Sequence, residues 1–133
     1  MKLELINPIK ALNKAYLKEK VSRNHIELFK KNLQQLLSRI NEQESEEHLK
    51  NVIADFLKDT WYKDQFEINT KDRNDLVIHT GKTTKEPVGV ILEVKKPSNK
   101  AEMMTEAKPK FKALQELILY YLRERADHNS TRY

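Results

Sequence analysis

The sequence predicts an α/β domain in which a small mixed sheet is flanked by helices, with a helical hairpin ahead of it. Apolar residues recur every three or four positions over residues 22–41, 45–57 and 105–125, as on one face of an amphipathic helix. Between the last two ranges, short runs rich in valine and isoleucine are bounded by polar turns, which is typical of strands. A chain of 133 residues is long enough for one domain with one core, so we expect residues 1–133 to be a single domain.

The first two helices have recognisable starts. Asn7 is a good cap, and Pro8 is tolerated at the first helical position, which predicts a helix from Pro8 to about Lys18. Ser22 caps a second helix that reaches about Asn41. We expect the two to pack as a hairpin and residues 8–44 to form the N-terminal helical part of the domain.

The third helix carries two adjacent glutamates in its first turn. Ser45 is its expected cap, and Glu46 and Glu47 follow, where carboxylates favour the positive end of a helix. At 100° per residue, Glu46 lies beside the apolar stripe that begins at Leu49, and Glu47 points to the opposite side. If one of the pair reaches the interior, we expect it to be Glu46, although two glutamates also commonly decorate a helix start.

Three strands are expected next. The first is Trp61 to Ile68, followed by a polar turn over residues 69–73, and the second is Asp75 to Thr80. A hairpin connection then leads to the third strand, Val88 to Val94, which is almost continuously apolar. Such a run suits a strand buried on both faces.

The last helix is expected from Thr105 to Arg125, after which residues 126–133 have no apolar pattern and are expected to fray or to continue into another segment. Its predicted buried side consists of Phe111, Leu114, Leu117, Ile118, Tyr121 and Leu122. Residues 45–125 would thus form a core with the order helix, three strands and helix.

Composition narrows the class of protein. Cysteine is absent, which excludes disulfides and thiolate metal sites, and there is no apolar run long enough to span a bilayer and no signal segment. We therefore expect a cytoplasmic location. The net charge of +5 favours polyanion partners. Lys96, Lys100 and Lys108 crowd the end of the third strand and are candidate DNA-binding residues.

Asp75, Glu93 and Lys95 form the candidate catalytic constellation. Asp75 starts one strand, and Glu93 and Lys95 end the next, two positions apart and therefore on the same face of a strand. Mg²⁺ takes hard oxygen ligands, and one or two carboxylates with substrate phosphate are enough to hold it. Asp75 and Glu93 are the expected ligands, with the backbone carbonyl of Val94 as a further one.

The remaining roles follow from phosphodiester chemistry, in which catalysis is mainly positioning and charge neutralisation. Lys95 would orient the attacking water or hydroxide and offset negative charge at the phosphate. Glu46, if it faces inward, would complete the metal shell or hold a metal-bound water. The alternative is a solvated strand end with a glutamate and two lysines, and an aspartate that merely starts a strand.

These residues match a known pattern. Asn74-Asp75 through Glu93-Val94-Lys95 resembles the PD-(D/E)XK nuclease motif, with Asn in place of its usual Pro. More narrowly, three stretches look like the amino-terminal cleavage domain of type IIG-like single-chain restriction–modification enzymes: Glu46 to Asn51, Asn74 to Ile78, and Ala113 to Leu122. The resemblance extends from about Leu5 to Arg125.

The resemblance implies a restriction-endonuclease-like fold and an Mg²⁺-dependent endonuclease of double-stranded DNA, with Mn²⁺ as a substitute metal. It implies a larger polypeptide that also carries a target-recognition domain and a methyltransferase domain using S-adenosylmethionine, neither of which these residues resemble. Cutting both strands could require a dimer. The family core usually has a fourth strand after the last helix, and the chain stops before it, so we expect a cleavage module that lacks this strand.

Two other functions remain open at this point. The chain could be a catalytically incompetent DNA-binding or domain-interaction module of the same fold. It could also be a structural α/β domain whose helices between Pro8 and Asn41 serve a partner. Convergence of Asp75, Glu93 and Lys95 at one edge, with Mg²⁺ binding there, would distinguish the nuclease from both alternatives.

Overall fold

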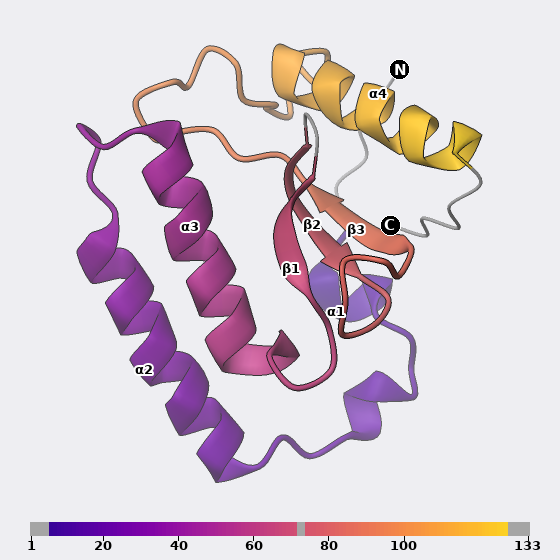
Figure 1. Cartoon of the computed structure of the whole chain (residues 1–133). Coiled ribbons are helices and arrows are strands. Elements are labelled where there is room, and N and C mark those ends of the chain that lie inside the picture. Colours follow the sequence, from indigo (N-terminus) through magenta and orange to yellow (C-terminus); the bar gives the residue numbers. More distant parts are fainter. Residues whose placement is uncertain (1–5, 72–73, 128–133) are drawn as a thin grey trace.

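The computed structural model describes residues 6–71 and 74–127, without the side chains of Asn74 and Asp75. Over these residues the fold is mixed α/β, with four α-helices and a three-stranded antiparallel sheet in the order β1-β2-β3 (Figure 1). None of the helices in the described part is long and apolar enough to cross a membrane.

The sheet consists of β1 (Ile68–Lys71), β2 (Asn74–His79) and β3 (Val88–Leu92). Both pairings are antiparallel, and in the second one Leu76 lies opposite Leu92. The expectation of a mixed sheet is therefore wrong for these strands. The reason is the short connections, because parallel neighbours need a crossover of a dozen or more residues.

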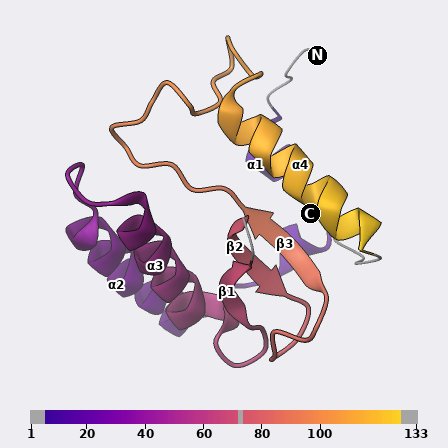
Figure 2. The same cartoon turned by 45° about the horizontal axis from the view of Figure 1, so that its top comes forward.

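Helices cover both faces of the sheet. On one face, α3 (Glu46–Leu57) contributes Leu49 to a core that contains Ile68, Leu76, Ile78 and Val94. On the other face, α4 (Lys112–Ala126) places Leu117 and Tyr120 over Val77, Val88 and Ile91. Figure 2 shows the sheet between these two helices. The predicted burial of the third strand on both faces is confirmed, since residues of β3 belong to both cores.

The expected first helix is wrong. Instead of one helix over residues 8–18, α1 (Pro8–Ala11) is a single turn, and a 3₁₀ turn follows at Tyr16–Lys18. The Asn13 side chain accepts a hydrogen bond from the backbone N–H of Ala15, which favours a local turn over a continuing helix. Ile9 and Tyr16 remain 65% and 63% exposed, so no burial compensates the cost of helix nucleation.

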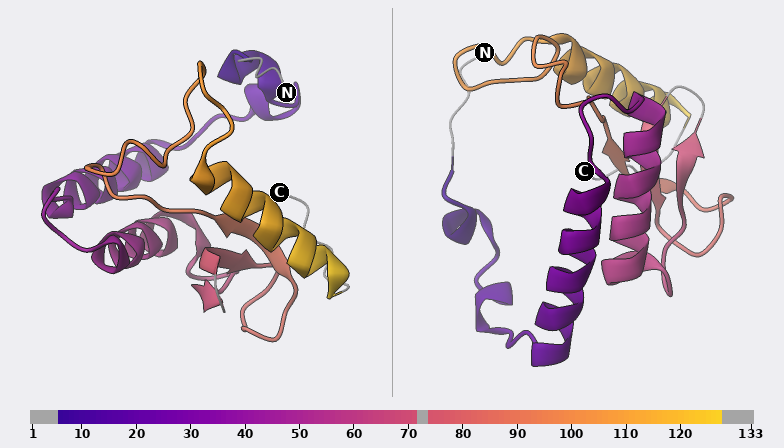
Figure 3. Two further views of the ribbon diagram at one scale, coloured as in Figure 1. Left: turned by 90° about the horizontal axis from the view of Figure 1, so that it is seen from above. Right: turned by 90° about the vertical axis from the view of Figure 1, so that its left-hand side faces the viewer.

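The helical hairpin is formed by other partners. Ser22 caps α2 (Arg23–Arg39) as predicted, and this helix packs against α3 rather than against α1. Figure 3 shows α2 alongside α3, while the segment that carries α1 stands apart from the pair. The predicted second and third helices are thus confirmed, and only their pairing differs.

The expected first strand is also wrong. The residues Lys58–Tyr62 continue α3 as a π-helix. β1 begins at Ile68, the last residue of the expected strand, and continues through Lys71 into the expected turn. The Trp61 ring lies 5.5 Å from that of Phe56 and 5.8 Å from that of Phe29. The aromatic residues here form a cluster between α2 and the end of α3, and their spacing reflects that cluster rather than a strand.

The last helix begins later than expected and buries another side. Residues 93–111 form an irregular loop, and α4 starts at Lys112, after Pro109, whose ring disfavours a helical residue before it. The buried residues of α4 are Ala113 and Glu124, whereas the predicted core residues Ile118 and Leu122 are 46% and 57% exposed. The predicted tail beyond residue 127 lies outside the described residues.

Candidate functional site

The site lies just beyond β3. This strand ends at Leu92, two residues earlier than expected, and the chain continues through Glu93, Val94 and Lys95. Val94 is buried in the core under α3. Glu93 and Lys95 project to the same side of the chain. Their side chains form an ion pair there, with 2.5 Å between Lys95 Nζ and Glu93 Oε1.

Three carboxylates surround the Lys95 ammonium. Lys95 Nζ lies 2.5 Å from Glu93 Oε1, 3.0 Å from Glu116 Oε2 and 3.8 Å from Glu46 Oε1. We call these four residues the Lys95 cluster. They come from the end of β3, the first turn of α3 and the second turn of α4, so the cluster forms where both covering helices meet the edge of the sheet.

Local structure explains why Glu46 takes part. The Ser45 hydroxyl accepts a hydrogen bond from the His48 N–H at 3.1 Å and so fixes the start of α3 at Glu46. Glu46 then faces Lys95, while Glu47 points away and pairs with Lys50 at 3.4 Å. Of the two adjacent glutamates, the structure therefore brings Glu46 into the site.

The cluster keeps Lys95 charged. The side chains of Lys95 and Glu93 are only 5% and 6% exposed. Burial by itself lowers the pKa of Lys95, but the hydrogen-bonding carboxylates of Glu93 and Glu116 outweigh it, and the pKa is raised above its ordinary value. The ammonium is thus a fixed positive charge and a hydrogen-bond donor, and it does not act as a base.

Two further charged residues, Lys112 and Glu102, extend the network from Glu116 away from Lys95. Lys112 Nζ is 3.8 Å from Glu116 Oε1 and 3.1 Å from Glu102 Oε2. The lysine lowers the pKa of Glu102, and Glu102 raises the pKa of Lys112. The backbone carbonyl of Glu102 also accepts from the Ala113 N–H at 3.2 Å. Charges therefore alternate in sign from the loop at Glu102, through Lys112 and Glu116, to Lys95.

The side chain of Asp75 lies outside the described residues, but its backbone belongs to β2. Asp75 directly precedes Leu76, and Leu76 pairs with Leu92, which directly precedes Glu93. Because the strands are antiparallel, the backbones of positions 75 and 93 lie at the same end of the β2–β3 pair. The fold thus brings the beginning of β2 to the Lys95 cluster.

The donors of the cluster suit a hard cation. Glu46 and Glu93 offer carboxylate oxygens of the kind that Mg²⁺ prefers, and the backbone carbonyl of Val94 stands between Glu93 and Lys95 in the chain. In the described ranges, no three His, Asp or Glu residues are grouped so that they could hold a metal ion. Mg²⁺ does not need three, since it keeps waters and takes substrate oxygens.

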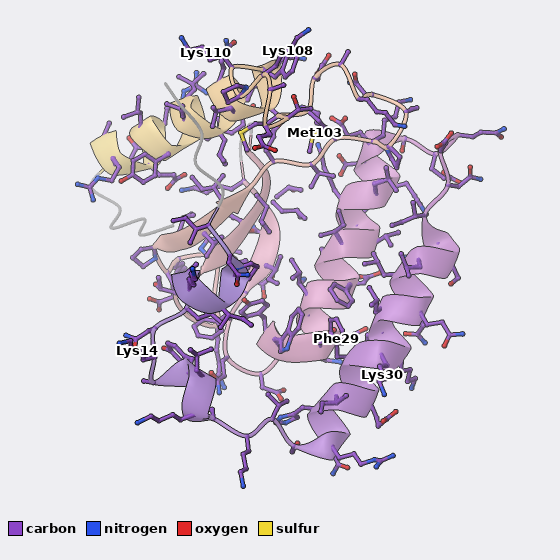
Figure 4. All side chains as sticks on the ribbon, turned by 180° about the vertical axis from the view of Figure 1, so that it is seen from behind. Lys14, Phe29, Lys30, Met103, Lys108 and Lys110 are labelled. Atoms are coloured by element: carbon purple, nitrogen blue, oxygen red, sulfur yellow. The ribbon has the colours of Figure 1, made fainter. Side chains whose placement is uncertain are left out.

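The predicted DNA-binding lysines lie on the loop of residues 93–111. Lys100 and Lys108 are exposed, and Lys96 is half-buried close to the cluster. Figure 4 shows Lys108 and Lys110 beside the start of α4, pointing outward. Together with Pro109 and Phe111, these two lysines line a surface hollow. The basic residues are therefore accessible near the same end of the sheet as the Lys95 cluster.

Sequence reasoning missed Glu116. The predicted buried side of the last helix was rotated toward Ile118 and Leu122, which placed Glu116 away from the sheet. Its signal was the spacing from Ala113, since residues three apart share a helix face. With Ala113 and Leu117 recognised as buried, Glu116 would have been expected at the edge of that face.

One family model matches the chain. It describes DUF7149, a domain of unknown function, and it matches residues 6–132, so the chain belongs to this family. No curated protein and no solved structure matches the chain.

Proposed function

We propose that this member of the DUF7149 family is an Mg²⁺-dependent endonuclease domain that hydrolyses DNA phosphodiesters, and that it is the cleavage module of a larger restriction–modification enzyme. The observation that carries the proposal is the Lys95 cluster. A buried, permanently charged lysine is paired with Glu93 two residues before it, next to the backbone of Asp75 and within reach of Glu46. Carboxylates can hold Mg²⁺ and a fixed lysine can stabilise developing charge at a phosphate, so the cluster suits metal-assisted phosphodiester hydrolysis.

In this proposal Glu93, Asp75 and the carbonyl of Val94 would hold Mg²⁺. When bound, the ion would make water more acidic and stabilise the negative charge that develops at the phosphate. Lys95 donates hydrogen bonds to the attacking water or to a phosphate oxygen and offsets charge there. Glu46, whose side chain is about half as exposed as that of Glu47, would hold a water close to the lysine.

The element order supports the finer proposal of a PD-(D/E)XK core. A helix with an inward glutamate (α3) is followed by three strands and a covering helix, and the acidic motif lies across β2 and the end of β3. We further propose that double-stranded DNA is the substrate and that target recognition and methylation reside in other domains of the polypeptide. Lys96, Lys100 and Lys108 would contact the phosphates.

The alternative function is a DNA-binding or interaction module of the same fold without catalysis. One observation favours it: three carboxylates already surround the Lys95 ammonium, as in a purely structural ion-pair network. The two functions differ in what happens to DNA cleavage and to DNA binding when an acid of the cluster is removed.

The decisive experiment is Glu93→Ala in the full-length protein. We expect it to abolish DNA cleavage in Mg²⁺ while leaving the fold intact, because Glu93 is the assigned metal ligand at the end of β3. Cleavage of plasmid DNA and far-UV circular dichroism are the measurements. Glu47→Ala is the matched control, since Glu47 points away from the cluster, and it should cut at the wild-type rate.

A folded Glu93→Ala protein that cuts DNA as fast as wild type would refute the site assignment. If wild-type protein itself never cuts but binds DNA with or without Glu93, the non-catalytic alternative is correct. Binding that does not weaken with salt would contradict both functions, because phosphate contacts release counterions.

A further inference from the structure

We propose that Glu116 of α4 is a positioning residue, which holds the Lys95 ammonium in place while Glu93 binds the metal ion. This inference rests on the proposed function and deepens it, because it assigns a role to a residue outside the recognised motif. Glu116 Oε2 lies 3.0 Å from Lys95 Nζ, closer than Glu46 Oε1 at 3.8 Å.

Such a residue is needed because Glu93 has two roles in the proposal: it pairs with Lys95 and it binds the metal ion. A carboxylate that binds a divalent cation gives up part of its attraction for a neighbouring ammonium. Lys95 would then keep two carboxylates, and only Glu116 is at hydrogen-bonding distance. An ammonium on a flexible four-carbon chain needs such a fixed partner to stay aimed at one point.

Glu116 is well placed to be rigid. It is on the second turn of α4, flanked by the buried Ala113 and by Leu117, which packs on Val77, Val88 and Ile91. The helix is further tied to the sheet at its other end, where Glu124 binds Lys71 of β1 at 2.8 Å and 2.9 Å. The packing of the helix therefore fixes the backbone from which the Glu116 side chain extends.

The geometry also distinguishes Glu116 from a metal ligand. Its Oε2 faces Lys95 and its Oε1 faces Lys112, so each carboxylate oxygen already has a cation. Lys112 is in turn held by Glu102 at 3.1 Å. A carboxylate whose two oxygens each face a lysine can orient those lysines, but it is poorly suited to bind a metal ion as well.

The experiment is steady-state cleavage of a DNA substrate by full-length Glu116→Gln protein. We expect kcat to fall by about 10- to 100-fold, the usual effect of removing a supporting residue around a metal site. The KM for DNA and the Mg²⁺ concentration at half-maximal rate should stay within about twofold, since neither phosphate contacts nor metal ligands change. Glu106→Gln, on the exposed part of the loop, is the control and should match wild type.

Glu116→Asp is the second variant, and it tests the inference if Glu116→Gln does not fold. It keeps the negative charge and shortens the side chain by one methylene. We expect kcat between those of wild type and Glu116→Gln, with thermal unfolding close to wild type. Wild-type kcat in a folded Glu116→Gln protein, or in Glu116→Asp where Glu116→Gln does not fold, would overturn the inference.

A large rise in the Mg²⁺ requirement of either variant would also overturn it, because that result makes Glu116 a metal ligand. The failure of this inference is separable from failure of the proposed function. Undiminished cleavage by Glu93→Ala defeats both, whereas loss of cleavage by Glu93→Ala with an unaffected Glu116→Gln defeats only the role of Glu116.

Discussion

Lys95 is the residue around which the candidate site is built. Taking an ammonium and its carboxylates out of water costs free energy, and the attraction between them often does no more than offset that cost. The cluster is therefore weak evidence for extra stability and better evidence for fixed geometry. Removing the lysine alone is a different matter, because it takes the shared ammonium away from three crowded carboxylates.

We therefore expect Lys95→Met to lower the free energy of unfolding by on the order of 3 kcal/mol at pH 8. The wild-type lysine is fully charged at this pH, since its contribution is fully present below the unfolded pKa of 10.5 and is lost only as the pH rises through the still higher folded value. Urea unfolding of the variant and of the wild type at pH 8 measures the difference.

Lys30→Met is the control for this experiment, because Lys30 is an exposed lysine whose side chain is 63% accessible in its ion pair with Glu27. It should change the unfolding free energy by less than about 0.5 kcal/mol at pH 8. A Lys95→Met protein as stable as wild type at pH 8 would show that the carboxylates do not depend on the lysine.

For individual residues, the sequence predicted well the relative directions of side chains that are close together along the chain. The spacing of Glu93 and Lys95 predicted a shared side, and the helical angle predicted that Glu46 rather than Glu47 would face inward. Glu116 was not predictable in the same way. Its role depends on the rotation of α4 about its axis, and α4 is apolar on more than one side, so hydrophobicity alone did not fix which side meets the sheet.

Among the secondary-structure elements, the two helices with serine caps were predicted well, whereas the first helix and the aromatic segment were not. Ser22 and Ser45 are local signals, and both cap as expected. Trp61 to Ile68 was misread because Tyr62, Phe66 and Ile68 are separated by even numbers of residues, as on one face of a strand, although the aromatic residues belong to a cluster at the end of a helix. The packing of Trp61 against Phe29, 32 residues earlier in the chain, is a tertiary contact that no local pattern reports.

The contribution of the Ser45 cap of α3 to stability can be measured. Ser45→Ala removes the acceptor for the His48 N–H at the helix start that carries Glu46, and we expect it to cost about 1 kcal/mol of unfolding free energy. Chemical denaturation measures the loss. Ser22→Ala, at the start of α2, is a comparison variant with an equivalent hydrogen bond and should cost a similar amount.

The two variants should differ in activity. Only Ser45→Ala loosens the turn that presents Glu46, so in the proposed nuclease it should slow cleavage while Ser22→Ala leaves cleavage unchanged. Equal cleavage rates in both variants would argue that Glu46 is not needed in a fixed position.

On the scale of the whole molecule, the site depends on the complete fold. Its charged residues lie at positions 46, 93, 95 and 116, on α3, after β3 and on α4, and the sheet holds these elements together. The fold class and the layered arrangement were predictable from hydrophobic periodicity. The direction of strand pairing and the irregular loop of residues 93–111 were not, because they depend on connections and on contacts distant in sequence.

The loop lysines give a prediction about DNA binding as a whole. In a cleavage-deficient Glu93→Ala background, changing Lys100 and Lys108 to Gln should weaken binding for all DNA sequences. It should also reduce the slope of log affinity against log salt by about 0.9 for each phosphate that the variant no longer neutralises. Fluorescence anisotropy at several salt concentrations is the measurement. Lys14→Gln and Lys30→Gln serve as controls and should leave the slope unchanged, because Figure 4 shows both lysines away from Lys108.

Val94 has a consequence for chain length. It is buried against Leu49 and Ile68, while the charged side chains before and after it turn to the opposite face. A single residue inserted between Leu92 and Glu93 would exchange these directions and drive a carboxylate or an ammonium into the apolar core. In the family, we therefore expect insertions and deletions to fall in the 80–87 hairpin or after residue 96, and the distance from Val88 to Lys95 to be constant even where the amino acids between them vary.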